Sequence, residues 1–181
     1  HGLHRATALP ALMMQRFWIT AAITFGLDQL SKLAVVQGLD LFHRGEIDVF
    51  PPFLTFRMAW NYGINFGLLS HGSDLARWGL VALALVISAW VVWWMRRERG
   101  NWKAELAGGL LVGGALGNIV DRIVYGAVAD FLNMSCCGIE NPYAFNVADI
   151  AIFAGALGLV LFAKGGETRK PTGGKPSRPR R

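Results

Sequence analysis

The stretch from Gly79 to Met95 reads GLVALALVISAWVVWWM and contains no charged residue. An apolar run of this kind is typical of a helix that crosses the roughly 30 Å hydrocarbon core of a bilayer, at about 1.5 Å per residue. The composition agrees, since 53% of the 181 residues are hydrophobic and 17% are charged. Average soluble domains contain about a quarter charged residues. This segment therefore predicts a helical protein embedded in a membrane.

Three further apolar blocks predict an all-α membrane protein with a bundle of four transmembrane helices. The expected spans lie at about residues 14–36, 75–95, 106–125 and 147–163, within one membrane domain of residues 14–164. Residues 1–13 precede Met14 and are interpreted as an N-terminal extension or a cloning remnant. Residues 165–181 are rich in Gly, Pro, Lys and Arg and are expected to form a disordered basic tail.

The distribution of Lys and Arg predicts the orientation of these spans. Segment 96–105 and the C-terminal tail carry most of the cations, whereas segment 37–74 has only Arg44 and Arg57 and segment 126–146 has none. Cytoplasmic segments are enriched in Lys and Arg, so both termini are expected in the cytoplasm. Orientation also accounts for the net charge of +6, and no nucleic-acid partner is expected.

Two segments predict how the bundle is built. Residues Ile47–Trp60 contain apolar residues and a Pro-Pro pair, and we expect a small cap of strands and loops on the membrane surface. Gly109, Gly113 and Gly117 recur at every fourth residue, a spacing that allows close contact between helix backbones in lipid. Helix packing is therefore favoured over phosphate binding, because no Gly-Lys-Ser/Thr follows these glycines.

Polar side chains at membrane depth are costly, so each requires a partner or a task. In the predicted topology they gather at the outer end of the bundle and leave the inner half apolar. The set comprises Asp28, Lys32, Asn118, Asp121, Arg122, Asp130, Asn146 and Asp149. Several spans that place polar groups at one level define a candidate site.

Simple structural roles compete with catalysis for each of these groups. Asp28 and Lys32 are four residues apart on one helix face and are expected to form an ion pair. Arg122 has three possible roles: pairing with Asp121, extending to the interface, or donating to a substrate carbonyl.

Asp130 and Asp149 flank the cation-free outer segment, and a helical hairpin can bring them to one depth. Two adjacent carboxyls share a proton, and such a pair can activate water and protonate a carbonyl, as in aspartic proteases. Because amide dipoles at a helix start favour a negative charge, Asp149 is expected to be the ionised partner and Asp130 the protonated one. The alternatives are a helix-start acid for Asp149, with Asn146 as N-cap, and a hydrated loop acid for Asp130.

Five motifs in one order resemble the lipoprotein signal peptidase family, also called signal peptidase II. The resemblance covers about residues 17–162. The motifs are DQLSK (28–32), NYGINFG (61–67), GGALGN (113–118) followed by DR (121–122), VADF (128–131) and FNVAD (145–149).

The resemblance implies an aspartic endopeptidase of the bacterial inner membrane, with its active site at the periplasmic face. It implies that Asp130 and Asp149 are catalytic. It also implies supporting or substrate-binding roles for Asp28, Lys32, Asn61, Gly63, Asn118, Arg122 and Asn146. The implied substrates are diacylglyceryl-modified prolipoproteins, cleaved just before the lipidated cysteine. No metal ion or organic cofactor is implied, and the expected partners are these signal peptides and membrane lipids, with the protein as a monomer.

Other functions are compatible with parts of the pattern. A small proton-coupled transporter also uses membrane carboxylates, but its polar groups would extend across the membrane depth. In a non-enzymatic assembly factor, the acids would serve only as caps and ion pairs. Cys136 and Cys137 are adjacent and have no neighbouring His, so they are interpreted as incidental loop thiols and not as a zinc site.

Overall fold

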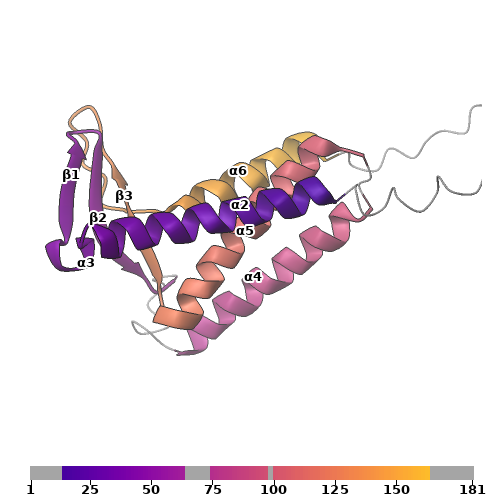
Figure 1. Cartoon of the computed structure of the whole chain (residues 1–181), viewed down its shortest axis with the longest axis horizontal. Coiled ribbons are helices and arrows are strands. Elements are labelled where there is room, and N and C mark those ends of the chain that lie inside the picture. The colour runs from indigo at the N-terminus through magenta and orange to yellow at the C-terminus, as the bar shows by residue number, and fades with distance from the viewer. Residues whose placement is uncertain (1–13, 64–73, 98–99, 164–181) are drawn as a thin grey trace, which may run out of the picture.

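The computed structural model describes residues 14–63, 74–97 and 100–163. Four longer helices run side by side, and a small sheet stands across one end of them (Figure 1). The helices are α2 (Gln15–Lys32), which continues as the π-helix η1 (Leu33–Gly38), α4 (Asp74–Met95), α5 (Trp102–Tyr125) and α6 (Val147–Phe162). The sheet end holds the short helix α3 (Leu41–Arg44) and the strands β1 (Glu46–Phe50), β2 (Leu54–Asn61) and β3 (Val128–Met134).

Three of the helices confirm the prediction of membrane spans. The segments Gln15–Gly38, Asp74–Met95 and Trp102–Tyr125 are long and apolar enough to cross a bilayer. Helix α6 is apolar but has only 16 residues, so a fourth crossing stays a prediction. Helix α5 begins four residues earlier than expected because the Asn101 side chain accepts the Ala104 N–H and caps it.

Glycines on α5 bring its backbone against two neighbouring helices. A Cβ added at Gly109 would lie 2.6 Å from the carbonyl oxygen of Phe17, and one at Gly113 would lie 2.5 Å from that of Ala21. On another side of α5, a Cβ at Gly114 would lie 2.6 Å from the carbonyl oxygen of Ala148 in α6. The predicted packing role of the glycine repeat is confirmed, since a side chain there would push the helices apart.

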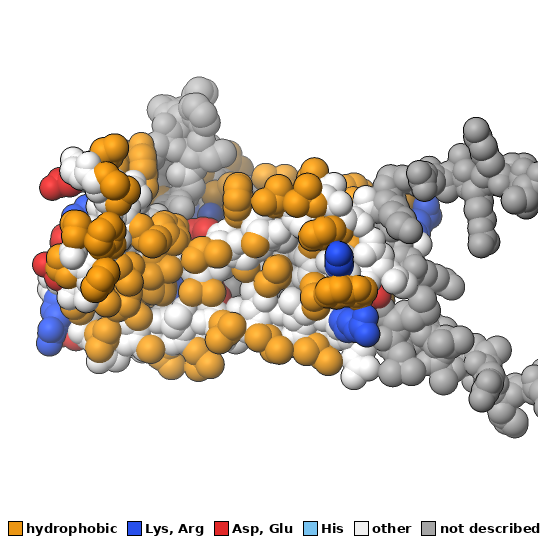
Figure 2. Space-filling model, turned by 90° about the horizontal axis from the view of Figure 1, so that it is seen from above, with side chains coloured by type: hydrophobic (Ala, Val, Ile, Leu, Met, Phe, Trp, Pro, Cys, Tyr) orange, Lys and Arg blue, Asp and Glu red, His pale blue; other side chains and the backbone are white. Residues whose placement is uncertain are grey.

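The apolar core lies at the end of the bundle away from the sheet. Phe17 of α2, Val91 and Met95 of α4, and Leu111 of α5 are among its buried members. Large apolar side chains also cover the flank of the bundle, whereas Lys, Arg, Asp and Glu gather towards its ends (Figure 2). A lipid-facing flank with polar ends is the arrangement expected of a membrane bundle.

The sheet confirms the strands that were predicted for the cap segment and adds a strand that the sequence did not reveal, while the position of the cap on the membrane surface stays a prediction. Its order is β1-β2-β3, with both pairings antiparallel. Strands β1 and β2 belong to the expected cap segment, but β3 lies in what was predicted to be an outer loop. Its pairing places Ala59 opposite Asp130 and Trp60 opposite Ala129. Asp130 is therefore held on a strand.

Two predictions fall outside the described residues. These are the N-terminal extension, residues 1–13, and the basic tail, residues 165–181.

Candidate active site

Eight of the nine predicted site residues are brought together at the sheet end of the bundle. They come from the end of α2, the end of α5, the start of α6, and strands β2 and β3. These residues are Asp28, Lys32, Asn61, Asn118, Arg122, Asp130, Asn146 and Asp149, and one hydrogen-bonded network joins them. Gly63 lies beside it, because its N–H donates to Asn61 Oδ1 at 3.0 Å.

Lys32 is the charged centre of the network. Its Nζ lies 2.8 Å from Asp28 Oδ2 and 2.7 Å from Asp121 Oδ2, and it donates to Asn118 Oδ1 at 3.3 Å. The side chains of Asp28 and Asp121 are 0% and 1% exposed. An ammonium has three donors, so this one is fully occupied.

The predicted pair of Asp28 and Lys32 is confirmed, but the pair proves to be a triad with Asp121. Lys32, and not Arg122, is the ion-pair partner of Asp121. The Asp28 carboxylate also accepts the Ala148 N–H at 2.9 Å. The triad therefore ties α2 to α5 and to the first turn of α6.

Two asparagines connect the triad to the predicted catalytic acids. Asn118 Oδ1 accepts from Lys32, and its amide donates to Asp149 Oδ1 at 3.0 Å. The Asn146 amide donates to Asn118 Oδ1 at 3.3 Å and to Asp130 Oδ1 at 2.6 Å. Each asparagine thus uses both its acceptor and its donor within the site.

Asp130 is 3% exposed and is held by amides from two elements. Besides Asn146, the Asn61 amide donates to its Oδ2 at 3.1 Å. Burial, and then the negative charge of Asp149, raise the pKa of Asp130 to about 7, although both amide contacts oppose the shift. The alternative of a hydrated loop acid is therefore wrong, because this carboxyl is buried on a paired strand.

Asp149 is half-buried at the start of α6 and also has a structural role. Asn146 is the N-cap: its Oδ1 accepts the Asp149 N–H at 2.9 Å, and Asp149 Oδ2 accepts the Asn146 N–H at 3.2 Å. The helix-start alternative is therefore confirmed. It does not separate Asp149 from Asp130, because one residue, Asn146, donates to both carboxylates.

Arg122 extends towards the acids without an ion-pair partner at salt-bridge distance among the described residues. Its guanidinium donates to Asn118 O at 3.3 Å, and its Nε is buried with no partner in the described part of the chain. Asp149 and Asp130 are its main charged neighbours. A buried donor left free beside two carboxyls is suited to a ligand carbonyl.

The sequence did not reveal two side chains that take part in the hydrogen bonds of the site, nor one buried acid at the other end of the bundle. Gln29 donates to both Asp28 Oδ2 and Asp121 Oδ1 at 3.1 Å. Arg77 of α4 donates to Arg122 O at 2.7 Å and so covers the end of α5. The expectation of an apolar opposite half is wrong at Glu105, which is 5% exposed in the first turn of α5.

Comparisons with known proteins show which family this chain resembles. Residues 20–164 match the model described as signal peptidase (SPase) II. A protein of Methylobacterium sp. strain 4-46 described as a lipoprotein signal peptidase is 41% identical over 157 residues, which are 87% of this chain and 93% of that one. A protein of Rhizorhabdus wittichii with the same description is 46% identical over 144 residues, or 79% and 82% of the two chains.

Solved structures agree on the fold. A structure described as a bacterial membrane enzyme is 26% identical, with a TM-score of 0.68, and the match covers 88% of this chain and 94% of that one. The architecture, the length of the family match and the identity to these relatives lead to one conclusion. The chain belongs to the signal peptidase II family, whose members are membrane peptidases that cleave signal peptides from lipoprotein precursors.

Proposed function

We propose that this chain is an intramembrane aspartic endopeptidase. It removes the signal peptide of diacylglyceryl-modified prolipoproteins by cleaving just before the lipidated cysteine. The observation that carries the proposal is the position of Asn146, whose side chain donates to Asp130 at 2.6 Å while its backbone N–H donates to Asp149 at 3.2 Å. A single residue thus holds the two carboxyls side by side.

The two acids differ in a way that suits general acid and general base roles. Burial raises the pKa of Asp130 to about 7, so its protonated form is available near neutral pH. Asp149 lies in the first turn of α6, where the amide dipoles favour the carboxylate. Asp149 therefore takes a proton from water while Asp130 donates its proton to the scissile carbonyl oxygen.

The tetrahedral intermediate then collapses to products. The C–N bond breaks, the proton held by Asp149 passes to the leaving nitrogen, and Asp130 recovers its proton from the intermediate. The free Nε of Arg122 supports this step as a donor to a substrate carbonyl. Such a donor is valuable where an unwound substrate segment has little access to water.

We further infer that α6 is the fourth span and that both termini are cytoplasmic. Phe153 and Val160 of α6 are 74% and 79% exposed, which favours contact with lipid. The arginine-rich segment after α4 then lies in the cytoplasm and the sheet end lies outside, where the lipidated cysteine of an exported precursor resides. One bundle encloses the site, so we expect a monomer.

The test is cleavage of a lipid-modified prolipoprotein by the purified protein. Asp130→Asn and Asp149→Asn should each abolish product formation, while circular dichroism shows an unchanged helical content. Asp48→Asn, in exposed strand β1, is the matched control and should retain activity. Near-normal turnover in either site variant would refute the paired-acid mechanism.

A further inference from the structure

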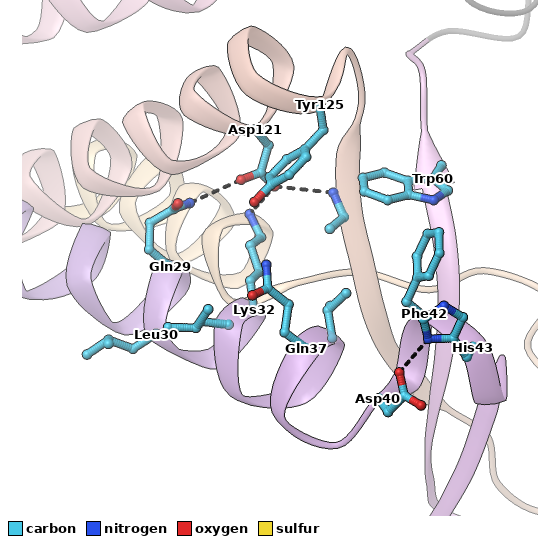
Figure 3. Close-up of a pocket in the computed structure, with 13 residues that line it drawn as sticks. Gln29, Leu30, Lys32, Gln37, Asp40, Phe42, His43, Trp60, Asp121 and Tyr125 are labelled. Carbon is cyan, nitrogen blue, oxygen red and sulfur yellow. Dashed lines mark hydrogen bonds and ion pairs between the residues drawn. The ribbon is translucent and has the colours of Figure 1, made fainter.

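A cavity outside the paired acids lies at the corner between the α2–η1 end, the end of α5 and strand β2 (Figure 3). Its volume is about 580 Å³, within the range usual for ligand sites. Asp130 and Asp149 are absent from its lining. The outer wall consists of Leu30 and Leu33, which are 63% and 53% exposed on a helix apolar enough to span a membrane. The cavity therefore borders the lipid phase.

The floor of this cavity is polar, and its two charged groups, Lys32 and Asp121, are already paired. Lys32 lies there with all three donors occupied by Asp28, Asp121 and Asn118. The Asp121 carboxylate accepts from Lys32, from Gln29 and from the Ala129 N–H at 3.2 Å. An apolar guest can therefore cover these two charged groups without leaving either of them unpaired.

Strand β3 separates this cavity from the paired acids. Successive strand residues point to opposite faces, so Ala129 faces the cavity while Asp130 faces the amides of Asn61 and Asn146. The bond between Asp121 and the Ala129 N–H closes the space between α5 and β3. A chain attached to a peptide at Asp130 would have to pass around this strand, which disfavours the acyl chains of the substrate as the occupant.

The side chains at the rim of the cavity determine which lipid head group can bind there. Asp40, the N-cap residue of α3, and His43 of α3 lie there, joined at 2.6 Å and largely exposed. The lysine of the lining is already neutralised by two carboxylates, and the described lining contains no arginine. An anionic head group would find no free cation, whereas an amine would lie beside the Asp40 carboxylate.

We propose that this cavity binds one acyl chain of a membrane phospholipid with a zwitterionic, amine-bearing head group. The chain lies along Leu30, Leu33 and Val36, and the head group lies at the rim beside Asp40. The π-helical turn η1 supports the assignment, since it contains Leu33 and Val36 of the lining and such turns are frequent at functional sites.

Photo-crosslinking tests this proposal without requiring catalysis. The full chain is placed in phosphatidylcholine nanodiscs that contain phosphatidylethanolamine with a photoreactive acyl chain. Labelled peptides should contain Trp60 or Tyr125, which line the cavity. The same probe with a phosphatidylglycerol head group should label these peptides several-fold less, and equal labelling would overturn the head-group assignment.

Cavity-filling variants provide the control. Val36→Trp should lower the labelling about tenfold, whereas Val35→Trp, on the same turn but absent from the lining, should leave it unchanged. Leu33→Trp is a second filling variant if the first fails to fold. Labelling that persists in a folded filling variant would overturn the proposal. So would competition by an unlabelled lipid-modified prolipoprotein, because the cavity would then belong to the substrate.

Discussion

Replacing Lys32 with methionine keeps the length of the side chain and removes the cation that lies between Asp28 and Asp121. These carboxylates are 0% and 1% exposed and lie 2.8 and 2.7 Å from the ammonium. Removal of one partner from a buried ion pair costs about 3–5 kcal/mol, because the remaining charge is left uncompensated. The backbone N–H groups of Ala148 and Ala129 still donate to the two acids, so the costs of stranding each acid should not simply add. We therefore expect a loss of about 3–5 kcal/mol for Lys32→Met.

Because the lysine pairs with two acids, rescue requires two further changes. Asp28→Asn combined with Lys32→Met should recover only part of the lost free energy of unfolding, since Asp121 remains charged. Adding Asp121→Asn should recover most of the remainder. It should leave a deficit of about 1–2 kcal/mol from imperfectly paired amides.

The assay is equilibrium unfolding of the four proteins in the same detergent, monitored by circular dichroism. The order of stability should be wild type, triple variant, double variant and single variant. A Lys32→Met protein within about 1 kcal/mol of wild type would contradict the reasoning, because an uncompensated buried charge costs more than that. A triple variant no more stable than the single one would also contradict it.

The titration of Asp130, the glycine contacts of α5 and the orientation of the spans can each be tested. With its pKa raised to about 7, Asp130 should lose its proton as the pH rises through that value, so cleavage should fall above about pH 7. The wild type should also become less stable as the pH rises from about 4 to 7, because the unfolded chain releases this proton at a lower pH. Asp130→Asn should not show this loss of stability. Gly113→Ala should destabilise the bundle by about 1–3 kcal/mol through overpacking against α2, whereas Gly26→Ala, whose Cβ would meet nothing within 4 Å, should be neutral or stabilising in the same unfolding assay. A reporter enzyme fused after Lys103 should be active in the cytoplasm and one inserted within 134–142 should be active outside; the reverse pattern would contradict the proposed orientation.

The sequence predicted well those features that depend on local spacing. Helix α4 follows from its uninterrupted apolar run, and the pair of Asp28 and Lys32 follows from a separation of one helical turn. The glycine repeat of α5 likewise predicted close packing before the neighbouring helices were known. In each case the physical cause lies within a few residues of the effect.

Features that depend on distant parts of the chain could not be predicted in the same way. Strand β3 forms because it pairs with the edge of β2, and nothing within residues 128–134 indicates that partner. The ion pair between Asp121 and Lys32 forms only because α5 packs against α2, and spacing along the sequence does not indicate that packing. For Asp149, the helix-capping role and the position beside Asp130 were treated as alternatives, whereas Asn146 combines them in one residue.

The glycine contacts described for α5 also set the stiffness of the protein. Where Gly109, Gly113 and Gly114 meet the carbonyl oxygens of α2 and α6, the helices touch through their backbones. Such contacts contain no rotatable side chain that could change rotamer and allow the helices to slide. Helices α2, α5 and α6 should thus behave as one rigid frame, and this frame carries the triad, both asparagines and Asp149. The proposed reaction requires the two carboxyls to keep their relative position to within a fraction of an ångström. The frame holds Asp149 directly, and it reaches Asp130 on β3 through the amide of Asn146.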